Sequence, residues 1–170
     1  MTAQAADIYR YRDTNYDCLC LSNGRLFYAR EHGFQPEPVD TGCWDGYRCE
    51  FEITDVVKLQ ALYIHDEFGN YPPLNGVRVT PREGVDRLLS NVTLDKYENL
   101  NMIVDYTGKI LLAADFIWEY YIHKGLQRPY AYQTLLSAEF VGGVLKEMRD
   151  QSAIAEKLRT LKTVDRLAGR

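Results

Sequence analysis

The sequence has few of the residues from which catalytic and metal sites are commonly built. Its 170 residues include three histidines and four cysteines. Neither a Gly-x-Ser-x-Gly nucleophile motif nor a Walker A phosphate-binding loop occurs in it. These absences argue against the hydrolases and nucleotide-binding proteins that such motifs identify.

Long apolar runs are also missing. No stretch approaches the roughly 18–20 apolar residues of a membrane-spanning helix. Residues 1–7 have neither the basic start nor the apolar centre of a signal peptide. We therefore expect a cytoplasmic protein without a membrane segment. In that reducing compartment the four cysteines are expected to be thiols; they are Cys18, Cys20, Cys43 and Cys49.

Positive charge is scarce over most of the chain. Residues 1–143 hold 13 Lys and Arg against 20 Asp and Glu, whereas residues 144–170 hold seven against four. The body is therefore acidic and the C-terminal segment basic. An acidic body repels a phosphate backbone and attracts a basic protein. We expect no nucleic acid as a ligand, and a protein partner of basic charge.

Tyrosine, by contrast, is abundant, with 13 residues in a chain whose apolar fraction of 46% and charged fraction of 26% are ordinary for a globular protein. Aromatic residues favour strands, and they also favour contact surfaces. The length suits a single domain, residues 1–170. Composition thus predicts one sheet-rich domain.

The clearest pattern lies at residues 47–53, where apolar and charged residues alternate, as in a strand with one packed and one solvated face. Together with the apolar run at 58–64 it predicts a central antiparallel hairpin. Two further hairpins are predicted, at 17–29 around Asn23-Gly24 and at 100–113 around Thr107-Gly108.

The remaining elements complete an α+β fold with an antiparallel sheet of about six to eight strands. Residues 1–13 read as a frayed segment or a short helix, and a strand at 132–140 turns at Gly142-Gly143. A short helix is expected at 115–124, with Asp115 as its N-cap. A longer helix is expected at about 146–168, with an apolar stripe formed by Ile154, Leu158, Leu161, Val164 and Leu167.

Between the second and third hairpins lies a long loop, residues 66–84. Tyr71, Pro72 and Pro73 favour an extended segment, and Asn75 with Gly76 turns the chain. Long structured loops are often functional. The next segment, residues 85–94, fits a helix or a strand equally well.

The cysteines and histidines each have a structural and a chemical interpretation. Four thiols suit zinc, but their spacing differs from a zinc knuckle and Cys18, Cys20 and Cys49 occupy apolar strand positions. We therefore predict no metal and no cofactor. A Cys49–His65 nucleophile pair is disfavoured, because a symmetric hairpin places Cys49 opposite Leu62.

His65, followed by Asp66 and Glu67, has the composition of a general base beside carboxylates, or of a polar strand end entering a loop. The second interpretation is favoured. His123 falls in the last turn of the predicted helix at 115–124, where a cation satisfies late carbonyl groups.

Several segments resemble small bacterial sheet-rich proteins of the polymorphic-toxin immunity type. They are Trp44-x-Gly46-Tyr47 with Phe51-Glu52-Ile53, the run from Tyr71 to Gly76, and the hairpin around Thr107-Gly108. The resemblance spans about residues 40–145 and includes no catalytic motif. It implies a toxin-binding function without catalysis.

The leading hypothesis is accordingly a non-catalytic module that binds a basic partner through aromatic residues. Its candidate binding residues are Trp44, Tyr47, His65, Asp66, Tyr71, Pro72, Pro73, Asn75 and His123. One alternative is an enzyme or ligand-binding protein with a pocket between sheet and helix, with His65, Asp66 or His123 at its mouth. Another is a homodimer formed through the C-terminal helix.

Overall fold

The structure is a computed structural model that describes residues 6–39, 42–80, 94–123 and 126–167, with side chains of the last helix up to Leu161. The described chain forms an α+β fold: one mostly antiparallel sheet of nine strands, three short 3-10 helices and one α-helix. The predicted fold class is confirmed. The predicted element at 85–94 lies, except for Leu94, outside the described residues.

The elements follow one another along the chain in this order: β1 Ile8–Tyr11, β2 Thr14–Leu21, η1 Ala29–His32, β3 Tyr47–Ile53, β4 Val57–Ile64, β5 Asp95–Tyr97, β6 Met102–Ile103, β7 Gly108–Phe116, η2 Trp118–Tyr120, η3 Pro129–Ala131, β8 Tyr132–Val141, β9 Val144–Asp150 and α1 Ser152–Leu167.

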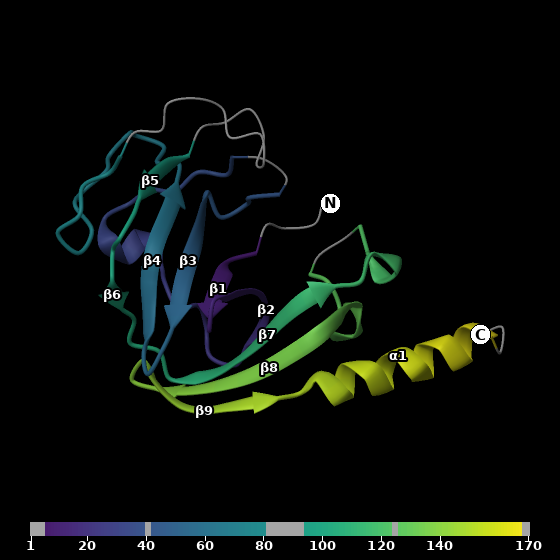
Figure 1. Ribbon diagram of the computed structural model, residues 1–170. Helices are drawn as coiled ribbons and strands as arrows, with labels where there is room; N and C mark the ends of the chain where they lie inside the picture. Colours follow the sequence, from purple (N-terminus) through teal and green to yellow (C-terminus); the bar gives the residue numbers. More distant parts are fainter. Residues whose placement is uncertain (1–5, 40–41, 81–93, 124–125, 168–170) are drawn as a thin grey trace.

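The strands lie in the order β5-β4-β3-β1-β2-β7-β8-β9, with β6 beside β4. The sheet bends strongly, so that β3 and β4 run almost at right angles to β8 and β9 in Figure 1. At the bend the two ends of the sheet meet, because Val56 bridges Val144 and Asp55 accepts a hydrogen bond from the Leu145 N–H at 2.9 Å. The curved sheet thereby encloses its own core.

One of the three predicted hairpins, the central one, is confirmed. β3 and β4 pair from Tyr47–Ile64 to Ile53–Val57, and Cys49 lies opposite Leu62 as expected. Buried residues alternate along β3, because its odd positions face the core. The predicted turn at Gly142-Gly143 also forms, with both glycines at positive φ, and it joins β8 to β9.

The hairpin predicted at 17–29 is wrong. Residues 14–21 form β2, which pairs with β1 and β7, and the chain after Gly24 leads into η1 instead of a return strand. The interpretation of residues 1–13 is wrong for the same reason, since Ile8–Tyr11 is a strand that pairs parallel to β3. Pairing of β2 with the preceding strand β1 and with the distant strand β7 took the place of the predicted hairpin.

The hairpin predicted at 100–113 is also wrong. Met102 and Ile103 pair with β4, whereas β7 pairs with β2 and β8. Thr107 and Gly108 therefore connect strands that are not neighbours. The Thr107 hydroxyl instead accepts the Gly142 N–H at 2.9 Å, which ties this connection to the β8–β9 turn.

The short helix predicted at 115–124 does not form. β7 continues through Phe116, and η2 is one turn of 3-10 helix. Asp115 has a φ of 60° and accepts a hydrogen bond from the Thr134 hydroxyl at 2.7 Å, so it is no N-cap. Pairing of β7 with β8 extends to Phe116–Tyr132 and overrides the local helical spacing.

The C-terminal helix exists but begins at Ser152 rather than near residue 146, because residues 144–150 pair with β8 as β9. Asp150 accepts the Ser152 N–H at 2.8 Å, and hydrogen bonding by the side chain and then the backbone of Ser152 lowers the pKa of Asp150. Of the predicted apolar stripe, Ile154, Leu158 and Leu161 are exposed.

The core has a large and a small part. The large part fills the curved sheet and includes Phe34, Phe51, Leu62, Ile110 and Phe140, all with almost no exposed surface. In the small part, α1 packs on the opposite face of β7 and β8, where its Ala155 joins a buried cluster that also comprises Ala113, Ala131, Tyr132 and Leu135. α1 then extends away from the sheet (Figure 1).

Candidate functional site

The structure brings some of the predicted binding residues together and separates others. Trp44 and Tyr47 line a cavity of about 330 Å³. It adjoins a second cavity of about 210 Å³, and the two share Ala6, Cys18, Leu19 and Leu126. We call the two cavities together the aromatic groove. Its lining further includes Asp7, Tyr9, Asp17, Arg25, Asp45, Phe116, Trp118, Tyr121, Leu126 and Tyr132.

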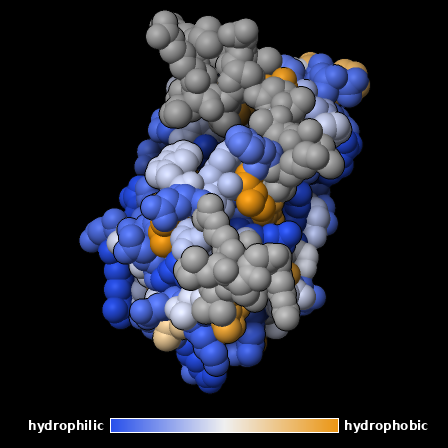
Figure 2. Space-filling model, turned by 90° about the vertical axis from the view of Figure 1, so that its right-hand side faces the viewer, coloured by the Kyte–Doolittle hydropathy of each residue, from blue (hydrophilic) through white to orange (hydrophobic). Residues whose placement is uncertain are grey.

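The groove is distinguished by large aromatic side chains exposed at its rim. Trp44 and Trp118 are 59% and 76% exposed, and Tyr121 is also exposed. The Trp118 ring lies 5.8 Å from Tyr121 and 5.3 Å from Phe116. Single exposed aromatic residues are normal on a protein surface, whereas a contiguous cluster such as Phe116, Trp118 and Tyr121 is typical of an interaction site. In Figure 2, which faces the side toward which α1 extends, apolar residues form separate patches on a mainly hydrophilic surface.

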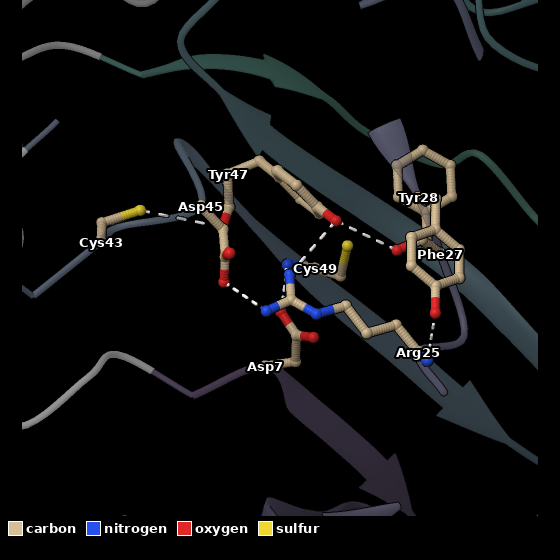
Figure 3. Close-up of polar contacts among 8 residues, drawn as sticks. All are labelled: Asp7, Arg25, Phe27, Tyr28, Cys43, Asp45, Tyr47 and Cys49. Carbon is tan, nitrogen blue, oxygen red and sulfur yellow. Dashed lines mark hydrogen bonds and ion pairs between the residues drawn. The ribbon is translucent and has the colours of Figure 1, made fainter. Parts of the chain in front are cut away.

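At one end of the groove, Arg25 contacts Asp45 and Tyr47 (Figure 3). Its Nη2 lies 2.6 Å from Asp45 Oδ2, and its Nη1 donates to the Tyr47 hydroxyl at 3.4 Å. The Tyr47 hydroxyl in turn donates to the Phe27 carbonyl at 3.1 Å. The hydrogen bond with Asp45 raises the pKa of Arg25 further, and burial raises that of Tyr47. The guanidinium charge is therefore already balanced by the protein itself.

Asp7 lies beside this network, just before β1. β1 is flanked by β3 and β2 in a register that places Asp7 between Cys49 and Cys18. The Cys49 N–H donates to Asp7 Oδ1 at 2.8 Å. Burial raises the pKa of Asp7 above its ordinary value, although this hydrogen bond and nearby Arg25 oppose the shift.

Burial keeps two of the thiols in and beneath the groove from ionising. It raises the pKa of Cys18 to about 12 and raises the pKa of Cys49 well above its ordinary value. Both are thus protonated at neutral pH, whereas a nucleophile or metal ligand must be a thiolate. In the described part of the chain all four cysteines are thiols, and no three metal-ligating side chains cluster. Cys20, predicted to occupy an apolar position, is exposed.

A third carboxylate, Asp17, lies in the second cavity. It accepts a hydrogen bond from the Tyr132 hydroxyl at 2.9 Å, and burial is the main reason why the pKa of Tyr132 is raised. Among the described residues, the lining of the groove has three carboxylates, those of Asp7, Asp17 and Asp45, and one guanidinium, that of Arg25. Its charge and its rings suit a cationic side chain.

The loop of Tyr71, Pro72, Pro73 and Asn75 lies elsewhere and lines neither cavity. Its polar groups bond inward: the Tyr97 hydroxyl donates to the Pro72 carbonyl at 2.8 Å, and Asn75 Nδ2 donates to the Leu100 carbonyl at 2.7 Å. Burial is the main reason why the pKa of Tyr71 is raised to about 12. These contacts give the loop a structural role.

Asp66 and His65 also make structural hydrogen bonds at the start of this loop. Asp66 is 2% exposed, and its carboxylate accepts the N–H groups of Gln35, Phe68 and Asn70. The His65 N–H donates to the Gly46 carbonyl at 2.9 Å. This geometry matches a polar strand end better than a catalytic base. His123 is exposed and contacts the Tyr121 ring edge-on at 4.9 Å, which places it near the groove.

No family model, curated protein or solved structure matches the chain. Among the described helices, none is long and apolar enough to cross a membrane.

Sequence reasoning missed Asp7, Arg25 and Asp45. No local motif marks them, because they come together only in the fold. Asp7 precedes β1, which pairs parallel to β3, while Arg25 follows β2 and Asp45 precedes β3. Trp118 and Tyr121 lie in the segment predicted as a short helix, and their place in the same groove as Trp44 depends on the strand order.

Proposed function

We propose that the protein is a non-catalytic protein-binding module of the immunity type, which neutralises a basic toxin or effector. The binding surface is the aromatic groove, and the segment that it accepts carries Lys or Arg side chains. The observation that carries this proposal is the gathering of Trp44, Trp118 and Tyr121 around three carboxylates.

The chemistry of the groove supports this choice of partner. Trp and Tyr dominate the energetics of protein interfaces, because their rings bury a large area at a low entropic cost. A cationic side chain gains from an aromatic face and from a neighbouring carboxylate. Because the chain from residue 1 to 143 is acidic, it also attracts a basic partner from a distance.

Capture from the lysate of the organism that encodes the chain tests the proposal. We expect the tagged protein to retain a basic polypeptide near one to one, and the double variant Trp44→Ala/Trp118→Ala to lose it, with affinity falling about 100-fold or more. Phe68→Ala is the matched control, since Phe68 is 73% exposed on a different loop.

Two further readouts separate the immunity function from nonspecific adhesion. Association should slow markedly as salt rises, because steering between opposite charges is screened. Coexpression with the captured polypeptide should relieve its toxicity, and the double tryptophan variant should not. Equal retention by the double variant, or association independent of salt, would contradict the proposal.

A second candidate is supported by the larger cavity of about 330 Å³, which is in the size range of small-molecule sites. The carboxylate of Asp7 in its wall would select a small cationic ligand. A thermal-shift screen with amines and guanidines tests this candidate. A ligand that stabilises the native protein but not Asp7→Asn would favour it over a protein partner.

A further inference from the structure

β9 is the last strand in the sheet order, and its far side is open along part of its length. At the start of β9, Leu145 donates its N–H to Asp55. At its end, the Gln151 N–H points to the Leu135 carbonyl of β8. Main-chain groups alternate between the two sides of a strand. Those of Met148 and Asp150 therefore face away from β8, and in the described part of the chain no strand pairs with them.

The open part, residues 146–150, has an unusual charge order. It reads Lys146, Glu147, Met148, Arg149, Asp150, so that each charge has the opposite sign to the residue at equal distance on the other side of Met148. Charges on an edge strand normally prevent pairing with another strand. Here, however, the charges of the segment are complementary to those of an identical segment that runs in the opposite direction.

We propose that β9 pairs antiparallel with β9 of a second copy of the chain, with Met148 on the two-fold axis. In this register Glu147 lies opposite Arg149 of the second copy, and Lys146 lies opposite Asp150. Each pair occurs twice because the contact is symmetric. The outward main-chain groups of Met148 then bond to those of its counterpart, and the two sheets become continuous.

The neighbouring strand gives a reason for the pairing. Glu147 lies directly opposite Glu139 of β8, a like-charge pair, while Lys109 lies 3.4 Å from Glu139 on its other side. Within the chain, Arg149 also reaches Glu147. Adding Arg149 of a second copy on the open side would place a cation beside this pair of carboxylates, on the side of Glu147 away from Glu139.

Apolar groups flank the same edge. Met148 lies opposite Ala138 and packs against the large core, so two Met148 side chains would join the two cores. The register also brings the first turn of α1, with Ile154 exposed, beside the β8–β9 turn of the second copy, where Val141 and Val144 are exposed. The bulge that leaves Lys146 as an extra residue lies at the outer end of the paired segment, so the pairs nearest the two-fold axis are Glu147 with Arg149.

Sedimentation equilibrium of the full chain at several concentrations tests the proposal. We expect a reversible dimer for the native protein. Glu147→Arg and Arg149→Glu should each raise the dimer dissociation constant about tenfold or more, because each places like charges opposite each other twice. An equimolar mixture of the two variants should restore the dimer, since every cross-strand pair is then opposite in charge.

The double variant Glu147→Arg/Arg149→Glu should also restore the dimer, because it keeps the charge order complementary. Circular dichroism shows whether each variant is folded, and Ser137→Ala provides a control on the adjacent strand. A native protein that is monomeric at all concentrations overturns the proposal. So does a dimer that survives both single substitutions, or one that is lost on Leu158→Ser and unaffected by charge, which would assign the contact to α1.

Discussion

In the loop after β4, aromatic hydroxyl groups bond inward. Tyr97 donates to Pro72, and Tyr71 accepts the Asp66 N–H at 3.3 Å. Around the groove, in contrast, Trp44 and Trp118 keep more than half of their surface exposed. What separates a structural aromatic residue from a candidate binding residue here is the exposure of its ring, which the sequence does not reveal.

Of the substitutions that test this comparison, Asp66→Ala is expected to change the free energy of unfolding most. Asp66→Ala would leave the N–H groups of Gln35, Phe68 and Asn70 without their acceptor in a partly buried site. We expect a loss of roughly 3–5 kcal/mol in the free energy of unfolding, measured by denaturant titration. Glu67→Ala, at an exposed neighbour, should change it by less than about 0.5 kcal/mol. Similar values for the two variants would refute the structural role of Asp66.

A smaller effect compares one residue from each region. Tyr97→Phe removes the hydrogen bond to Pro72 from a fully buried ring and should cost about 1 kcal/mol of stability. Trp118→Ala removes a larger side chain, yet its exposure limits the expected loss to less than about 1 kcal/mol. Thermal unfolding measures both. A severe loss for Trp118→Ala would make it part of the core.

The smallest effect concerns pH. Because burial raises the pKa of Asp7 in the folded state above its ordinary value of 3.8, the folded state holds that proton more tightly than the unfolded chain. This contribution to stability is present at low pH and is lost as the pH rises from 3.8 through the raised pKa. Asp7→Asn should flatten this part of the stability–pH curve, measured by urea titration at several pH values. An unchanged slope would contradict the assigned shift.

The sequence predicted elements whose partners lie nearby along the chain. The strict alternation at Tyr47–Ile53 and the Gly142-Gly143 turn each specify a hairpin, and both hairpins form. Asn23-Gly24 gives an equally strong turn signal, but no hairpin forms there, because β2 pairs with β1 and β7 instead. The residues at 115–124 likewise have helical spacing, and pairing with β8 outweighs it. Long-range pairing is invisible to local pattern analysis.

The candidate site was predictable in its composition and not in its assembly. Trp44 and Tyr47 could be singled out because a tryptophan and a tyrosine beside a strand often form contacts. Asp7 could not, because its role depends on the N–H of Cys49 in a strand far along the chain. The Tyr71 segment was a reasonable candidate that the structure places outside the groove.

The position of β1 has a consequence for how the chain folds. Ile8–Tyr11 lies between β3 and β2, so this strand joins the half of the sheet that holds β3 and β4 to the half that holds β2, β7, β8 and β9. Its pairing with β3 closes the long loop between Tyr11 and Tyr47, a slow step compared with forming hairpins. Each half can form its hairpins early, and the two halves then join when β1 pairs with β3.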